Sequence, residues 1–175
     1  MANVDIANGF NPTGMIYGLG RYALDASTST ASFRNDLMMM ISDGNVEPAT
    51  ANQTVTLGSL QGTTSASTAQ KALVAASTAA TVLISDHPDQ RYIAQDDASD
   101  TSAETYIGNN ADIVAGSGNT TTGLSGHEIA SSDKKSATPL IRLIDIQRRG
   151  DNAFGANADW LCRINEHFYA TTTGV

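Results

Sequence analysis

Residues 159–175, DWLCRINEHFYATTTGV, decide the fold class of this chain. Within this stretch Trp160, Cys162, Ile164 and Phe168 fall on one side of an alternating pattern, and polar or charged residues fall on the other. Successive side chains of a β-strand point to opposite faces of its sheet, so a period of two predicts a strand with one buried face. A free cysteine on such a face behaves as a small apolar side chain.

Two further stretches are apolar on both faces, which is typical of strands inside a sheet. Residues 140–146 read LIRLIDI, and residues 37–41 read LMMMI. The first stretch predicts a central strand. The second predicts a strand within the core or under a partner. Methionine also forms adaptable interaction surfaces, but core packing is the favoured interpretation of this run.

Shorter patterns predict a strand and a hairpin in the remaining chain. Residues 15–24 fit a short strand. Residues 82–84 and 92–94 fit the two strands of a hairpin, which would turn through the sequence DHPD at residues 86–89.

Helical signals are few. Thr101 and Glu104 have the spacing of a capping box, which predicts a helical turn over residues 102–107. Residues 64–80 are rich in alanine, which favours a helix, and in serine and threonine, which weaken one, so helix and extended structure both remain open there.

Many short strands, turns rich in Gly, Asn and Asp, and one or two short helices predict a mainly β fold, a single β-barrel or β-sandwich domain.

Residues 1–15 hold Phe10 as their one large anchor. Such a segment buries too little apolar surface to order itself, so we expect an extended N-terminal arm that lies on the domain or on a neighbour. The β-rich domain then spans residues 16–175.

Residues 112–126, DIVAGSGNTTTGLSG, open like a nucleotide-binding turn, with an apolar run followed by glycines. A dinucleotide site needs the pattern G-x-G-x-x-G at the start of a helix. Here the third glycine, Gly123, comes too late, and the threonines before it disfavour a helix. A turn between two strands is the favoured interpretation, and we expect no cofactor.

Charge and hydropathy limit the classes of partner that this chain is expected to bind. The chain has 18 acidic and 10 basic residues, a net charge of -8, which would repel a phosphate backbone, so nucleic acid is not an expected partner. Residues 86–133 hold nine acids and one base, whereas the chain from Lys134 onward holds six bases and four acids. This distribution fits either a dipole that orients the protein on a partner or unpatterned surface charge. No apolar run approaches the roughly 18 residues of a membrane span, and the first residues lack the features of a signal peptide, so we expect no membrane association.

Signals for metal binding and catalysis are weak. An acidic run resembles calcium ligands in residue type but lacks the EF-hand spacing; it comprises Asp96, Asp97, Asp100 and Glu104. His127 and His167 each adjoin a glutamate, and neighbours along a strand point to opposite faces, so neither pair is placed to share a proton. Cys162 fits a core residue better than a nucleophile. We therefore expect no metal site and no enzymatic activity.

Several stretches, taken in order, resemble the capsid decoration (cement) proteins of tailed bacteriophages. They are MANVDIANGFNPTGMIYG at the start, DHPDQRYIAQDD, NADIVAGSGNTTTGLSGHEI, PLIRLIDI, GANADW at residues 155–160, and INEHFYATTTGV at the end. The resemblance covers about the first eighteen residues and most of residues 81–175, whereas residues 21–80 depart from the family pattern.

The resemblance implies a non-enzymatic virion protein, assembled in the bacterial cytoplasm, that binds the outer surface of an icosahedral capsid as homotrimers. Its partner would be the major capsid protein, whose neighbouring subunits it would hold together. We expect the arm to contact a capsid or neighbouring subunit through Phe10, Pro12 and Tyr17, because it cannot fold alone. The alternative is a tail or baseplate β-module that binds a host glycan or calcium.

Overall fold

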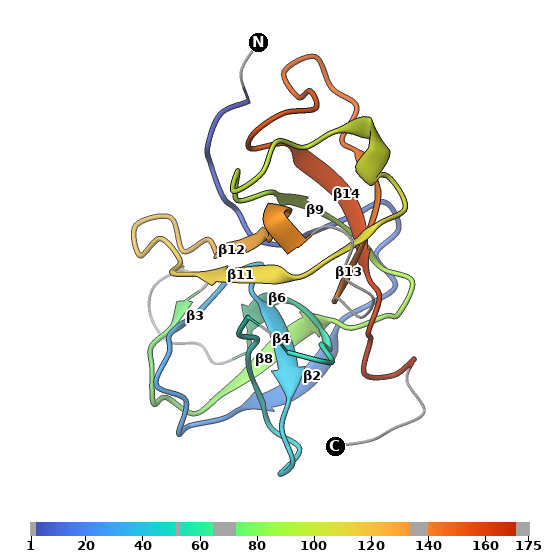
Figure 1. Cartoon of the computed structure of the whole chain (residues 1–175). Coiled ribbons are helices and arrows are strands. Elements are labelled where there is room, and N and C mark those ends of the chain that lie inside the picture. The colour runs from blue at the N-terminus through green and yellow to red at the C-terminus, as the bar shows by residue number, and fades with distance from the viewer. Residues whose placement is uncertain (1–2, 52, 65–72, 134–139, 171–175) are drawn as a thin grey trace.

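The fold is mainly β and consists of two strand assemblies, which lie one above the other in Figure 1. The structure, a computed structural model, describes residues 3–51, 53–64, 73–133 and 140–170. One assembly is a closed five-stranded barrel and the other is a five-stranded antiparallel sheet. The mainly β class and the barrel expected from the sequence are confirmed.

The barrel takes its strands from the first half of the chain. In order around the barrel they are β2 (Gly20–Leu24), β5 (Val46–Pro48), β4 (Leu37–Met40), β6 (Gly58–Thr63) and β8 (Ala80–Ser85). Its strands pair antiparallel except β2 and β5, whose pairing is parallel. These strands supply most of one apolar cluster, Leu24, Met38, Val46, Leu57, Leu60, Val74, Val82 and Ile84.

The five-stranded sheet joins the N-terminus to the second half of the chain. Its order is β1 (Asn11–Thr13), β9 (Arg91–Gln95), β14 (Asp159–Ile164), β13 (Ile141–Ile146) and β10 (Asn110–Ala111). Trp160, Cys162 and Ile164 are buried on its inner face, so the alternation predicted for the C-terminal strand is confirmed as far as residue 164. The central position predicted for β13 is also confirmed, since it has a neighbour on both sides.

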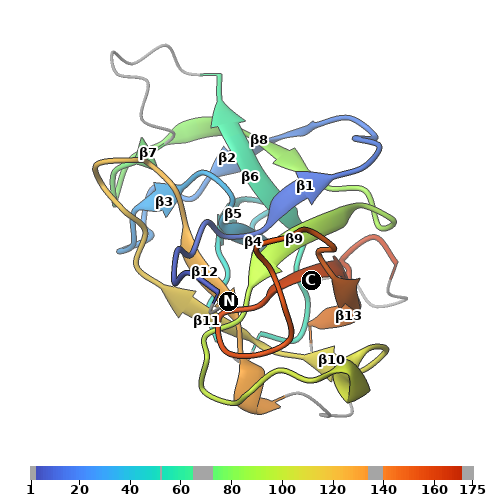
Figure 2. The same cartoon turned by 90° about the horizontal axis from the view of Figure 1, so that it is seen from above.

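Smaller elements complete the described structure. β3 (Ser32–Phe33) pairs with β7 (Leu73–Val74), and β11 (Ile113–Gly116) pairs with β12 (Gly126–Ile129). Figure 2 shows β3 and β7 at one side of the molecule, away from β13. The described helices are two short 3-10 turns, η1 (Glu104–Tyr106) and η2 (Ser131–Asp133).

Strand β4 belongs to both apolar cores. Leu37 joins the cluster under the five-stranded sheet, and Met38 joins the barrel cluster. Met39 and Met40 repeat this alternation and are half-buried against the same two clusters. The methionine run therefore packs in the core, as its apolar character on both faces predicts.

The hairpin predicted from residues 82–84 and 92–94 is wrong. β8 pairs with β2 and β6 in the barrel, whereas β9 pairs with β1 and β14 in the sheet. The turn between these two strands carries the chain from one assembly to the other. Each strand finds its partners far away in the sequence, and a local pattern contains no information about that choice.

Three other local predictions have different outcomes. The helical turn forms as η1, although no side chain caps it. The strand expected over residues 15–24 begins only at Gly20, and a loop precedes it. Of residues 64–80, the ambiguous stretch, Leu73 and Val74 form β7, whereas residues 65–72 lie outside the described residues, as do 134–139 and 171–175.

Close packing explains the glycines of residues 112–126. Gly116 and Gly126 lie opposite each other in the β11–β12 hairpin, and a Cβ atom on Gly116 would lie 2.2 Å from the Gly126 carbonyl oxygen. A Cβ atom on Gly118 would lie 2.2 Å from the Phe33 ring. Both positions exclude any side chain. The interpretation as a turn between two strands is confirmed, and close packing accounts for Gly116, Gly118 and Gly126.

Asp36 and His127 form a buried polar contact at the start of β4. Asp36 Oδ1 lies 3.7 Å from His127 Nε2. His127 Nδ1 accepts a hydrogen bond from the Leu37 N–H at 3.2 Å, so Nε2 carries the proton of the neutral ring. Burial raises the pKa of Asp36 to about 6, against hydrogen bonds from Ser125 and Phe33, and burial lowers the pKa of His127 to about 4. Between these values both groups are neutral, and the contact is not an ion pair.

Replacing Asp36 should change how stability depends on pH. The folded state holds the Asp36 proton more tightly than the unfolded state does. The contribution of Asp36 to the free energy of unfolding therefore falls as the pH rises from about 4 to about 6. The pKa of His127 is lowered, so its contribution to the free energy of unfolding rises over a similar interval. The two contributions oppose each other. In Asp36→Asn the free energy of unfolding should therefore rise by about 2 kcal/mol more than in the wild type between about pH 4 and pH 7. Urea unfolding at several pH values measures this difference, and equal slopes would contradict the assignment.

Candidate interaction surface

The five-stranded sheet has an outward face, formed by the side chains that alternate with its core residues. The register places Arg91 opposite Arg163 and Ile93 opposite Leu161, and it places Arg142 on the other side of Arg163. These side chains are half-buried or exposed. A bulge in β13 places Asp145 directly opposite Leu161 and leaves Ile144 between register positions. The outer sheet face comprises Arg91, Ile93, Arg142, Ile144, Asp145, Leu161 and Arg163, and Asp145 is already paired with Arg148.

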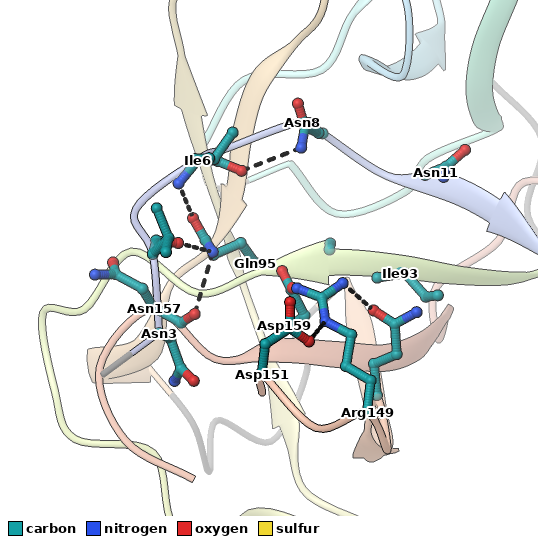
Figure 3. A pocket seen from close by; sticks show the side chains of 14 residues that line it. Asn3, Ile6, Asn8, Asn11, Ile93, Gln95, Arg149, Asp151, Asn157 and Asp159 are labelled. Carbon is teal, nitrogen blue, oxygen red and sulfur yellow. Dashed lines mark hydrogen bonds and ion pairs between the residues drawn. The ribbon is translucent and has the colours of Figure 1, made fainter. Parts of the chain in front are cut away.

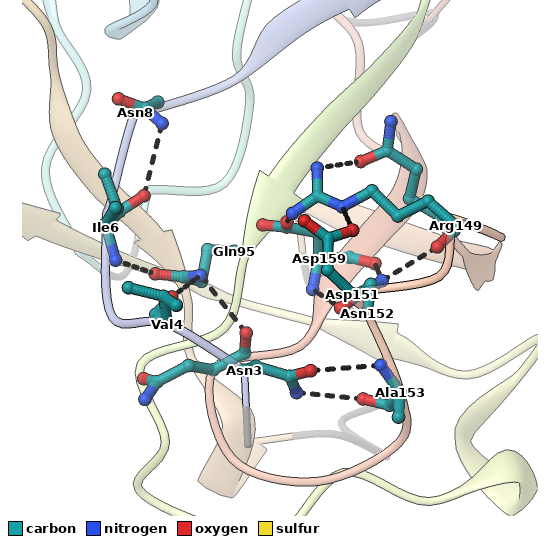
Figure 4. Close-up of polar contacts among 12 residues, drawn as sticks. Asn3, Val4, Ile6, Asn8, Gln95, Arg149, Asp151, Asn152, Ala153 and Asp159 are labelled. Atoms are coloured by element: carbon teal, nitrogen blue, oxygen red, sulfur yellow. Dashed lines mark hydrogen bonds and ion pairs between the residues drawn. The ribbon is translucent and has the colours of Figure 1, made fainter. Parts of the chain in front are cut away.

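Residues 3–9 cross one end of this sheet as an extended segment (Figure 4). Gln95 of β9 binds the segment backbone, since its Oε1 accepts from the Ile6 N–H at 2.8 Å and its Nε2 donates to the Val4 carbonyl at 2.9 Å. The amide of Asn3 accepts from the Ala153 N–H at 3.0 Å and donates to the Ala153 carbonyl at 2.9 Å. Side-chain amides thus replace strand pairing and hold the segment on its own domain.

A pocket of about 330 Å³ lies between this segment and the ends of β9 and β14 (Figure 3). Arg149 is the cation in it and pairs with Asp159 at 2.5 Å and with Asp151 at 2.7 Å. Burial raises the pKa of Asp159, although Arg149 opposes the shift. Since two carboxylates already neutralise the guanidinium, the pocket is suited to uncharged polar groups and not to a strong anion.

The loop between β1 and β2, residues 14–19, exposes apolar side chains at the other end of the sheet. Its exposed fractions are 72% for Met15, 58% for Ile16, 50% for Tyr17 and 43% for Leu19. The Tyr17 ring stacks on His87 with 4.0 Å between ring centroids and 14° between planes. Gly14 and Gly18 have φ values of 72° and 123°, a region that side chains disfavour, so they set the path of the loop.

The structure separates the three predicted contact residues. Phe10 is fully buried in its own core, which corrects the expectation that its side chain meets a neighbour. Pro12 is half-buried in β1, an edge strand, where a residue without an N–H is tolerated. Tyr17 is the one of the three whose ring is half exposed. The arm anchors on Phe10 because burying a phenyl ring outweighs ordering a short segment.

Two candidates for a nucleophile or a metal ligand, Cys162 and Asp96, are buried in the protein interior. Burial raises the pKa of the Cys162 thiol, which is a poor basis for nucleophilic attack. Asp96 is buried and accepts hydrogen bonds from Ser102 Oγ and from Trp160 Nε1. Within the described residues no group of three or more His, Cys, Asp or Glu side chains is arranged to hold a metal ion. The same part of the chain contains no helix long and apolar enough to cross a membrane.

Comparison with known proteins returned no match to any family model, curated protein or solved structure. The sequence pattern singled out Tyr17 but missed the arginines of the outer sheet face, because they come from three strands. A cross-strand row appears only once the register is known.

Proposed function

We propose that this chain is a non-enzymatic virion structural protein that binds the outer surface of an icosahedral phage capsid. It would cement neighbouring major capsid subunits and act as a homotrimer assembled in the bacterial cytoplasm. The motifs described above are the source of this proposal. One structural observation supports it: of eight large apolar side chains exposed among the described residues, four belong to the single loop of residues 14–19.

This concentration of apolar surface costs solubility unless a partner covers it. Exposed apolar side chains scattered singly are ordinary, whereas a contiguous group marks an interaction site. Met15, Ile16 and Leu19 belong to one loop. A surface of this kind, repeated in many copies, binds an assembled lattice through many weak contacts. A protein that binds only the assembled lattice stabilises that lattice by mass action.

Substitution in this loop tests the proposal. Ile16→Ser should lower the affinity for capsids that lack the protein by about tenfold or more. Loss of one central apolar contact reduces the binding free energy by about 1.4 kcal/mol or more. Co-sedimentation with capsids of the phage that encodes the chain measures binding. The matched control is Ile107→Ser, an exposed isoleucine outside this loop, which should bind like the wild type. Full occupancy by Ile16→Ser would contradict the role of the loop.

Copy number distinguishes the alternative class. A capsid cement protein is expected at on the order of hundreds of copies per virion, whereas a tail or baseplate module that binds a glycan or calcium is expected at a handful. Quantitative mass spectrometry of purified virions gives this number. A handful of copies would favour the tail module.

A further inference from the structure

Three arginines form a row across the middle strands of the five-stranded sheet. Arg91 of β9 is directly opposite Arg163 of β14, which is directly opposite Arg142 of β13. Directly opposite residues on antiparallel strands have Cα atoms about 5 Å apart and point to the same face. The row therefore directs three arginine side chains to the outer sheet face.

The described carboxylates leave this row unpaired. Within the described part of the chain, ion pairs of arginine involve Arg148 and Arg149, and none involves the row. Arg142 is positioned by neutral partners, since it donates to the amide oxygens of Asn110 and Asn165. Its charge is fixed in place without being neutralised.

A pocket of about 450 Å³ opens beside the row, lined by Tyr17, Asp89, Arg91, Ile144 and Arg163. Asp89 is the single carboxylate of this lining and makes no ion pair with the described residues. The pocket and row together carry three positive charges against one negative charge, on a chain whose net charge is -8. The other carboxylate of the face, Asp145, is neutralised by Arg148.

Such a row is unfavourable by itself. Like charges directly opposite on neighbouring strands destabilise a sheet, and nothing in the register forces arginine at these positions. Arginine presents a planar fork of donors that matches a carboxylate with two parallel hydrogen bonds. The cost is offset when a partner supplies the carboxylates.

We infer that the outer sheet face binds an acidic segment of a partner protein, with carboxylates on the arginine row. Ile93 and Leu161 lie beside the row on the same face, Ile144 lines the pocket with Arg91 and Arg163, and all three are half-buried. They therefore offer apolar contacts to the side chains between those carboxylates. A nucleic acid fits less well, because its continuous negative charge meets the repulsion of the whole acidic chain. The inference does not rest on capsid binding.

A labelled peptide of alternating glutamate and valine tests the inference, with a peptide of alternating glutamine and valine as the neutral control. Fluorescence anisotropy with the full-length protein should show binding of the acidic peptide only, weakening as salt is raised. Arg163→Gln should weaken binding about tenfold or more. Arg21→Gln is the matched control, because this exposed arginine belongs to β2 of the barrel and makes no ion pair with the described residues, and it should bind the acidic peptide like the wild type.

Four results would overturn the inference. They are no binding of the acidic peptide, equal binding by Arg163→Gln, equal binding of the neutral peptide, and tighter binding of a single-stranded oligonucleotide of matched charge. A shift of Arg163→Gln from oligomer to monomer, without peptide binding, would assign the face to a second copy of this chain instead. A protein that binds capsids but not the acidic peptide would refute this inference and leave the proposed function standing.

Discussion

Trp160→Ala should lower the free energy of unfolding by about 3 to 5 kcal/mol, because it removes the largest fully buried side chain. The indole lies in the core under the five-stranded sheet, with its ring centroid 6.0 Å from that of Phe154. Its Nε1–H donates to Asp96 Oδ2 at 3.2 Å and to Ser102 Oγ at 3.3 Å. The substitution leaves a cavity and removes a donor from a buried carboxylate, and both effects are unfavourable.

Guanidinium unfolding followed by far-UV circular dichroism measures this loss. Trp160→Phe is the informative control, since it keeps most of the ring volume and removes the N–H donor. It should lose about 1 to 2 kcal/mol, which separates the hydrogen bond from the packing. A melting temperature of Trp160→Ala equal to that of the wild type would refute the burial of this strand.

Phe10→Ala should destabilise the protein to a similar extent, by about 3 to 5 kcal/mol. The Phe10 ring is fully buried and packs edge-on to Tyr92 with centroids 6.5 Å apart. Its N–H donates to the Asn35 carbonyl at 2.9 Å, and its carbonyl accepts from Ser59 Oγ at 2.6 Å. The side chain and backbone of one residue thus tie the N-terminal segment to both strand assemblies.

The matched control for Phe10→Ala is Ile6→Ala, an exposed side chain in the same segment. It should change the free energy of unfolding by less than about 0.5 kcal/mol. Equal, small effects of both substitutions would contradict the anchoring of the segment. Deletion of residues 2–14 is a poor test of partner binding, since it removes Phe10 and β1 together and would unfold the sheet edge. Point substitutions in residues 14–19 avoid this difficulty.

Local patterns predicted the strands whose burial follows from spacing alone. The alternation of Trp160, Cys162 and Ile164 is confirmed, and so are the core position of the methionine run and the turn between two strands at residues 112–126. These predictions succeed because side-chain direction in a strand depends only on position along the chain. The glycines indicated a turn by their residue type, although the close contacts at Gly116 and Gly118 appear only in the tertiary structure.

The buried contact between Asp36 and His127 was not predictable in this way. The two residues lie 90 or so positions apart, and each has an ordinary sequence environment, so no local signal connects them. For Phe10 the sequence predicted a contact with a neighbouring subunit, and the structure places the ring in its own core instead. Its segment is too polar to fold alone, and the sequence could not show that the Phe10 ring packs beside Tyr92 in the core of the same chain.

The sequence by itself determined that the chain forms β-strands with buried faces, because a period of two in hydrophobicity is a local property. The tertiary structure alone decided which strands pair, that β8 and β9 belong to different assemblies, and that Arg91, Arg163 and Arg142 stand in one row. Pairing and register depend on contacts between distant parts of the chain, which are selected by the packing of whole faces against each other.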